Sequence, residues 1–232
     1  CKNAPKSGAF FMPVSFVLFS RGFGWLGVGL ASALLCACQG GSPVFDTAAS
    51  AWSPAERNPQ FVAKFEYLQV ELDGRLAYMA LGRREVVGAD VREFWYSGQR
   101  EMLHLLNGRI EQVFGMTREV RQVSEARPDW LHVLTQTQPV TWQRRLDLMP
   151  GYRYGVSEGV TTANAQRPRH VPDDVPPSAQ WLTEAVQRKE PHGQVSTYAQ
   201  WFALHEGRVV YSEQCVAADM CFKLKPLGLK GG

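Results

Sequence analysis

Two-residue turns that contain glycine and separate apolar runs constrain the fold of this chain most strongly. Asp73-Gly74, Asn107-Gly108 and Glu206-Gly207 each stand between two stretches rich in aliphatic, aromatic and β-branched residues. Tight hairpins need positive φ at both central residues, which glycine adopts at little cost. Several such hairpins in one chain are hard to accommodate in a helical protein, so the sequence predicts antiparallel strands.

The same pattern continues along the rest of the chain. Strands are predicted at residues 61–72, 75–86, 91–97, 101–106, 109–116, 130–136, 140–149, 152–162, 196–205, 208–214 and 221–227. The proline-rich segment 166–178 is predicted to be a loop. We therefore expect an all-β fold, either an antiparallel β-sandwich or a barrel-like domain built from successive hairpins.

Residues 180–190 leave two interpretations open. A helix could begin here, because Ser178 is a suitable capping residue. The alternation that places Trp181, Thr183 and Ala185 on one face instead favours a strand. We adopt the strand as the prediction.

The N-terminal region has the composition of a secretion signal. Residues 26–37 carry no charge and no strongly polar group, and Arg21 supplies a positive charge before them. This run is shorter than the ~20 residues that a membrane-spanning helix needs. It ends in Leu-Cys-Ala-Cys, a lipobox whose last residue is Cys38. We predict a signal peptide at residues 1–37, with Met12 as the true start, and lipid attachment to the Cys38 thiol.

The alternatives for this segment are a plain transmembrane anchor and a secretory signal without lipidation. Residues 38–60 are rich in glycine, serine, proline and alanine, so we expect a flexible linker behind the lipidated cysteine. The folded domain is predicted at residues 61–232. Gln39 is not the aspartate that favours retention in the inner membrane of enteric-type bacteria. The expected location is therefore the outer membrane, facing the periplasm.

Net charge argues against a nucleic-acid partner. The chain has 25 lysines and arginines against 22 aspartates and glutamates. Three of the basic residues, Lys2, Lys6 and Arg21, lie in the segment predicted to be removed, which leaves 22 basic and 22 acidic residues. A protein that binds nucleic acid through its phosphates normally carries an excess of positive charge, which the mature chain lacks.

Cysteine usage predicts a disulfide in the mature chain. If Cys38 is lipidated, Cys215 and Cys221 remain as an even pair. The periplasm is oxidising, so we expect these two residues to form a disulfide. Two free thiols are the alternative. A metal site is disfavoured because neither histidine nor a second cysteine pair lies nearby in the sequence.

One string resembles a catalytic motif. Residues 155–159, GVSEG, fit the G-x-S-x-G pattern of α/β hydrolases, in which a serine occupies a turn between a strand and a helix. Asp173 and His192 follow Ser157 in the order of a catalytic triad. The residues after the string are β-branched and then include proline, so no helix is expected, and a serine hydrolase is the least favoured function.

Histidines and aromatic residues carry weaker signals. The histidines, at 104, 132, 170, 192 and 205, show no metal-binding spacing, and the sequence predicts neither metal nor cofactor. Aromatic residues are numerous: Phe94, Trp95, Tyr96, Trp142, Tyr152, Tyr154, Trp201 and Phe202. They could form a surface that stacks on sugars or docks a protein, but packing in the core is the favoured interpretation.

Four segments follow one another behind the lipobox in a recognisable succession. They are residues 80–82 (ALG), residues 92–116 with the Asn-Gly-Arg turn, residues 146–157 (LDLMPGYRYGVS), and residues 200–214 with an aromatic pair and a Gly-Arg turn. In this order they resemble the YjbF/GfcB family, outer-membrane lipoproteins of exopolysaccharide and group 4 capsule loci. The resemblance implies an all-β fold and a link to polysaccharide export, and it implies no catalytic residue.

The chain departs from the family pattern in two places. The pair Cys215 and Cys221 is not expected of the family generally, and residues 171–192 are hard to match. The expected function is a non-enzymatic lipoprotein that assists secretion or assembly of an exopolysaccharide or capsule, with polysaccharide export proteins or glycan as partners. The alternative is a carrier of lipid or lipoprotein built on a half-open β-barrel.

Overall fold

The computed structural model describes residues 61–62, 64–123, 127–190 and 193–228. The predicted signal peptide, Cys38, the linker and His192 lie outside the described residues. In the part of the chain that is described, no helix is both long enough and apolar enough to span a membrane.

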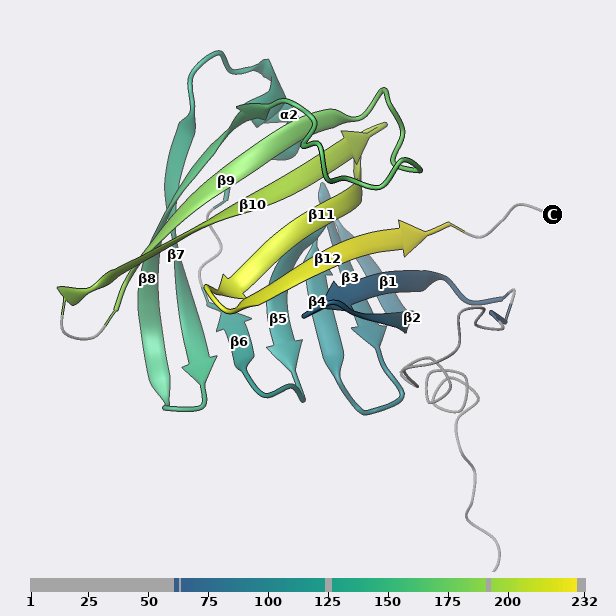
Figure 1. Ribbon diagram of the computed structural model, residues 1–232, viewed down its shortest axis with the longest axis horizontal. Coiled ribbons are helices and arrows are strands. Elements are labelled where there is room, and N and C mark those ends of the chain that lie inside the picture. The colour runs from purple at the N-terminus through teal and green to yellow at the C-terminus, as the bar shows by residue number, and fades with distance from the viewer. Residues whose placement is uncertain (1–60, 63, 124–126, 191–192, 229–232) are drawn as a thin grey trace, which may run out of the picture. The chain divides into compact units, whose positions relative to one another are not determined.

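Antiparallel strands make up most of the described chain. In chain order the elements are β1 (Tyr67–Leu72), β2 (Arg75–Val87), β3 (Asp90–Tyr96), β4 (Met102–Leu106), β5 (Arg109–Phe114), β6 (Glu119–Gln122), α2 (Trp130–Thr135), β7 (Val140–Met149), β8 (Arg153–Ala165), β9 (Gln180–Lys189), β10 (Val195–His205), β11 (Arg208–Ala217) and β12 (Met220–Leu227). Each strand pairs with the next, and β1 also pairs with β12, so the sheet closes into a barrel (Figure 1). The all-β prediction is confirmed in its barrel form.

The three predicted glycine turns are present, and all have left-handed backbone at both central residues. Their φ angles lie between 49° and 81°, at Asp73, Gly74, Asn107, Gly108, Glu206 and Gly207. The twist of such turns matches the right-handed twist of the strands that they join. The local conformational requirement of the turn therefore places the strand boundaries at these points.

The strand predicted at residues 130–136 is wrong, because Trp130–Thr135 form the helix α2. The Asp129 carboxylate caps this helix by accepting hydrogen bonds from the backbone N–H groups of Leu131 and His132. Trp130 and Val133, three residues apart, are the buried members of the helix. In so short a segment, spacing alone cannot distinguish a strand from one turn and a half of helix.

Most of the other predicted strands agree with the structure to within a few residues at their ends. Residues 140–149 form β7, the strands predicted at 152–162 and 180–190 correspond to β8 and β9, and the proline-rich segment between β8 and β9 is a loop. The strand predicted from residue 61 begins only at Tyr67. The short, polar β6 was not predicted, because four residues give too little alternation to be recognised.

Apolar side chains fill much of the barrel interior. The largest cluster of buried residues comes from β1–β7, β11 and β12, and consists of Leu68, Val70, Met79, Trp95, Leu103, Leu105, Ile110, Val113, Val120, Leu146, Leu148, Val216, Ala217, Met220, Phe222 and Leu224. Along β7 and β12 these residues alternate with more exposed ones, as expected for a sheet with one buried face. Burial of this apolar surface is the main favourable contribution to folding.

Two segments outside the sheet cover other apolar residues. Residues 166–179, which we call the strap, lie over Trp181, Ala203 and Tyr211. The helix α2 packs on Leu182, Phe202 and Leu204 at one end of the barrel (Figure 1). The strap and α2 therefore lie on two different surfaces of β9 and β10.

Candidate functional site

A group of buried charges surrounds Glu158 on β8. The Nε atoms of Arg144 and Arg188 each lie 2.6 Å from an oxygen of the Glu158 carboxylate, and the Tyr198 hydroxyl donates to it at 2.5 Å. The side chains of Arg144, Arg188 and Glu158 are at most 5% exposed. Two guanidinium groups face one carboxylate, so this set, which we call the Glu158 cluster, carries an excess positive charge.

The Glu158 carboxylate stays ionised at neutral pH. Burial by itself would raise the pKa of the Glu158 carboxyl, but the positive charges of Arg144 and Arg188 and the Tyr198 hydrogen bond outweigh it, and the pKa is lowered. Burial, together with the neighbouring Glu158 carboxylate, raises the pKa of Tyr198 to about 12. The carboxylate therefore remains an acceptor and the phenol remains a donor.

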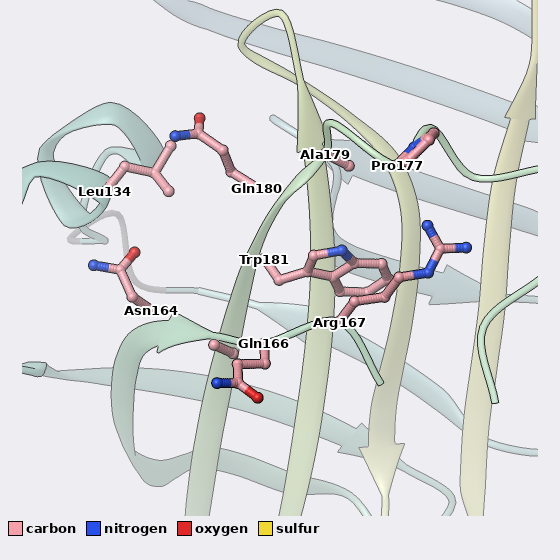
Figure 2. Close-up of a pocket in the computed structure, with 9 residues that line it drawn as sticks. Leu134, Asn164, Gln166, Arg167, Pro177, Ala179, Gln180 and Trp181 are labelled. Carbon is pink, nitrogen blue, oxygen red and sulfur yellow. The ribbon is translucent and has the colours of Figure 1, made fainter. Parts of the chain in front are cut away.

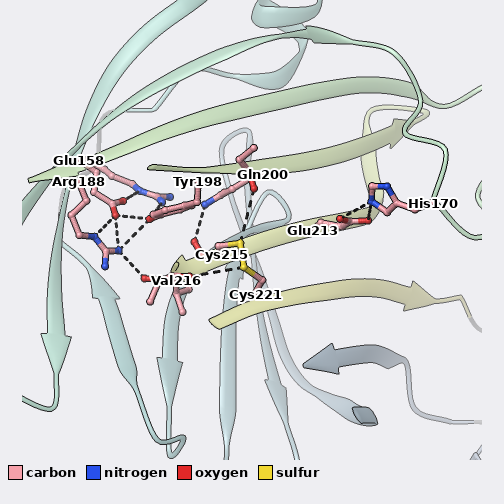
Figure 3. Close-up of a disulfide and its surroundings, with 12 residues drawn as sticks. Glu158, His170, Arg188, Tyr198, Gln200, Glu213, Cys215, Val216 and Cys221 are labelled. Atoms are coloured by element: carbon pink, nitrogen blue, oxygen red, sulfur yellow. Dashed lines mark hydrogen bonds and ion pairs between the residues drawn. A yellow bond between two sulfur atoms is a disulfide. The ribbon is translucent and has the colours of Figure 1, made fainter. Parts of the chain in front are cut away.

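The Glu158 cluster is linked to the β11–β12 hairpin. Arg188 donates to the carbonyl oxygen of Val216 at 2.7 Å, and the Gln200 amide donates to that of Cys215 at 3.0 Å (Figure 3). Cys215 and Cys221 are cross-strand partners and form a disulfide, with their Cα atoms 3.9 Å apart. The disulfide predicted from the sequence is thus present, and it closes the hairpin that the buried arginine contacts.

A second buried ion pair crosses the barrel. Arg109 Nε on β5 donates to a carboxylate oxygen of Glu184 on β9 at 3.0 Å. Because β5 and β9 are not neighbours in the sheet, this ion pair passes through the interior of the barrel. The Arg109 guanidinium also lies 3.2 Å from the ring centre of Trp130 on α2. Glu184 further accepts a hydrogen bond from the Thr162 hydroxyl. Burial lowers the pKa of Arg109, and Glu184 opposes that effect.

Sequence reasoning did not find these charges, although a signal was present. In β9, Leu182, Glu184, Val186 and Arg188 alternate with more exposed residues and are all buried. A charged residue in register with apolar neighbours on one strand face indicates a buried charge, which must be paired.

A pocket of about 470 Å³ lies where the strap begins and ends, beside α2. Its lining comes from the end of α2, the end of β8, the strap and the start of β9 (Figure 2). The lining residues are Leu134, Asn164, Ala165, Gln166, Arg167, Pro177, Ala179, Gln180 and Trp181. The pocket combines three side-chain amides, one guanidinium, one indole and several small apolar groups.

Hydrogen bonds hold part of this lining in place. Arg167 donates to the backbone carbonyls of Val175 and Pro172, both at 2.9 Å, and thereby fixes the course of the strap. Asn164 donates to the carbonyl of Gln136 just beyond α2. The strap is therefore held together internally, and the end of β8 is tied to the segment that follows α2.

The serine of the hydrolase-like motif lies in an ordinary strand. Ser157 is exposed in β8, which continues for eight more residues to Ala165, and no helix follows it. Eight strand residues span about 26 Å, and Asp173 lies on the strap beyond that end of β8. The structure therefore does not form a nucleophile elbow at Ser157, and His192 lies outside the described residues.

The described histidines are dispersed and make different contacts. His104 stacks on Phe94 with ring centres 4.3 Å apart, and burial lowers its pKa. His170 on the strap contacts Glu213, which precedes Cys215 by two residues on β11 (Figure 3). His132 lies on α2. Among the described residues, no three histidine, cysteine, aspartate or glutamate side chains are grouped so as to hold a metal ion.

The aromatic residues divide between core and surface. Trp95 and Phe202 are fully buried, in keeping with the preferred interpretation of the sequence. Tyr152 and Tyr154, near the β7–β8 turn, are 73% and 66% exposed. The Trp142 indole N–H donates a hydrogen bond to the Thr162 hydroxyl inside the barrel. Of the residues singled out in the sequence, only Trp181 contributes to the pocket.

Together these features define a class of protein: a small, closed antiparallel barrel with buried ion pairs in its interior and a polar pocket at one edge. A family model described as "Group 4 capsule polysaccharide lipoprotein gfcB, YjbF" matches residues 56–224. This chain belongs to the YjbF family, and the resemblance seen in the sequence is confirmed.

Comparison with solved structures supports the fold. The crystal structure of the hypothetical lipoprotein YmcC from Escherichia coli K12 superposes with a TM-score of 0.56 at 15% sequence identity. The match covers 71% of this chain and 84% of the YmcC chain. A search of curated proteins gives no match.

Proposed function

We propose that this protein is an outer-membrane lipoprotein on the periplasmic face that assists the secretion or assembly of a capsule or exopolysaccharide without catalysing a reaction. The observation that carries the proposal is membership of the capsule polysaccharide lipoprotein family over residues 56–224. The lipobox ending at Cys38 supports membrane attachment. The partners would be polysaccharide export proteins or the glycan itself.

Gene deletion with complementation tests the proposal. Loss of the gene should reduce the amount or the chain length of surface polysaccharide, and the native gene should restore it. Cys38→Ser should leave the protein unanchored after cell fractionation and should complement poorly. Ser157→Ala should complement fully, because no reaction depends on this residue. Unchanged surface polysaccharide in the deletion strain would refute the proposed role.

A lipid carrier is the second candidate, because a closed barrel can enclose a small apolar ligand. The buried charges weigh against it, since an acyl chain in this interior would contact Arg144, Glu158, Arg188 and Glu184. Mass spectrometry of the protein purified from membranes decides between the two candidates. A stoichiometric lipid that remains after extraction in mild detergent, beyond the covalent anchor, would favour the carrier.

A further inference from the structure

We propose that the pocket between the strap and α2 binds one acidic sugar unit of a polysaccharide. This inference rests on the proposed function and names the class of ligand that it requires. The pocket volume of about 470 Å³ lies within the range of small-ligand sites, roughly 300–1,000 Å³. It is therefore large enough for a sugar unit and its substituents.

The pocket offers the groups that recognise hydroxyls. Asn164, Gln166 and Gln180 are exposed at its edge, and each carries an amide that can both donate and accept. A sugar presents adjacent hydroxyls that also donate and accept, so amides match them in either direction. These three side chains come from two strand ends and the strap (Figure 2).

Trp181 contributes an unused donor to the lining. It is 5% exposed and packs edge-on against Tyr211. Its indole nitrogen is buried and has no acceptor among the residues that the structure describes. A buried donor without a partner is destabilising unless a ligand or water accepts from it. A ligand oxygen that reaches this nitrogen would satisfy the donor.

Arg167 gives the pocket its charge. It is the charged residue of the lining, and the lining includes no carboxylate. The guanidinium has five N–H donors, and the two carbonyls that it contacts are neutral acceptors. Its positive charge therefore remains available to a carboxylate on the ligand, which a uronic acid provides.

Binding measurements on the full-length lipoprotein in detergent test the proposal. The probes are tetrasaccharides of galacturonate, glucuronate and mannuronate, with uncharged maltotetraose for comparison, in isothermal titration calorimetry. At least one acidic tetrasaccharide should bind about fivefold or more tightly than maltotetraose. Failure of the whole acidic panel to bind, or equal affinity for maltotetraose, would overturn the proposal.

Matched variants locate the binding site. Gln180→Ala should weaken binding about fivefold, whereas Gln187→Ala, an exposed glutamine on the same strand but outside the pocket, should not. Trp181→Phe keeps an aromatic ring in the core but removes the indole N–H together with the fused pyrrole ring, so it should weaken binding and also lower thermal stability. Equal effects of Gln180→Ala and Gln187→Ala would refute this location.

The role of Arg167 is tested by the preference for acidic over neutral tetrasaccharide, and not by affinity alone. Arg167→Gln should abolish the preference for acidic over neutral tetrasaccharide, and Arg167→Lys should retain part of it. Arg169→Gln, an exposed arginine of the strap outside the pocket lining, should leave the preference intact. A preference that survives Arg167→Gln would contradict the proposal, even if that variant loosened the strap.

The inference and the proposed function can fail separately. If gene deletion alters surface polysaccharide but Gln180→Ala and Trp181→Phe complement fully, the pocket proposal fails and the proposed function stands. If deletion has no effect on surface polysaccharide, the proposed function fails, whatever binds in vitro.

Discussion

The Glu158 carboxylate makes it possible to bury the guanidinium groups of Arg144 and Arg188 in the barrel. It is the counter-ion for both Arg144 and Arg188 and accepts from Tyr198. Desolvating three charges is expensive, and only short, well-directed hydrogen bonds offset that cost. The stability of this part of the barrel therefore depends on the carboxylate more than on either arginine.

Glu158→Gln should lower the free energy of unfolding by about 3–5 kcal/mol, because it leaves two buried guanidinium groups without a counter-ion. Urea denaturation followed by circular dichroism measures the loss. Glu206→Gln, a change of the same kind at a side chain that is 85% exposed, serves as the control and should cost little. Similar urea midpoints for Glu158→Gln and Glu206→Gln would show that the Glu158 cluster contributes nothing to stability.

Tyr198 should make stability fall in alkaline solution. Its pKa is raised from 10.0 to about 12 on folding, so the unfolded chain loses its proton first. The contribution is fully present below pH 10 and is lost as the pH rises toward 12, by about 2–3 kcal/mol. Tyr198→Phe should remove this part of the slope in denaturation curves measured between these pH values.

Exposed Tyr154 provides the comparison for the alkaline experiment, since Tyr154→Phe should leave the slope unchanged. The pKa of Tyr211 is also raised, by burial and by Glu213, so part of the slope remains in every variant. If the fall of stability with pH is identical in the native protein and in Tyr198→Phe, its assignment to Tyr198 is contradicted.

At the scale of elements, the hairpin turns serve two purposes. They satisfy the local demand for positive φ, and one of them also packs across the barrel. A Cβ atom on Gly108 would lie 2.5 Å from Cβ of Val209, at the start of β11. Gln214 on β11 donates to the Gly108 carbonyl and accepts from the Ile110 N–H. The β4–β5 turn is thus held against a strand that is not its neighbour.

Gly108→Ala should therefore cost more than the same change at another glycine turn. We expect a loss of about 3 kcal/mol or more, from both the left-handed backbone and the clash with Val209. Gly74→Ala, at a similar φ but with no atom within 4 Å of the new Cβ, should cost about 1–2 kcal/mol. Thermal unfolding of both variants tests this, and equal losses would exclude the packing role.

The helix α2 illustrates how packing decides between two local structures. Residues 130–136 alternate well enough to suggest a strand, but Asp129 caps a helix and Trp130 and Val133 point to one side of it. Trp130 also packs against Phe202 and donates its indole N–H to the Asn107 carbonyl. Those partners lie far away in the sequence, so the preference for a helix could not be recognised from the segment itself.

At the scale of the whole molecule, closure of the barrel joins the two ends of the described chain. β1 pairs with β12 from Tyr67 opposite Leu227 to Leu72 opposite Phe222. This pairing removes both sheet edges, which would otherwise offer unpaired N–H and C=O groups to other chains. Because the contact is so distant in sequence, the barrel cannot close until the last strand is available.

A chain that stops after Asp219 lacks β12 and should fail to form the barrel. The exposed edges of β1 and β11 should make it aggregate, which size-exclusion chromatography and near-ultraviolet circular dichroism would detect. A chain that stops after Gly228 keeps all the paired strands and should remain monodisperse. A soluble, cooperatively folding chain ending at Asp219 would show that closure is dispensable.

The sequence by itself determined the features that depend on local physics. The requirement for positive φ predicts the turns at Gly74, Gly108 and Gly207, and the two-residue period of a strand predicts most strands between them. The two cysteines that remain after the predicted signal peptide and a lipidated Cys38 are set aside predict the disulfide between Cys215 and Cys221. Each of these inferences uses neighbouring residues or composition alone.

Only the tertiary structure decided the choice of barrel over sandwich, the interior charges and the pocket. Arg109 and Glu184 are 75 residues apart, and nothing local to either indicates that they pair. The pocket likewise combines α2, the end of β8, the strap and the start of β9. Such features depend on how strands far apart in the chain meet, which is set by closure of the whole sheet rather than by the preferences of any one segment.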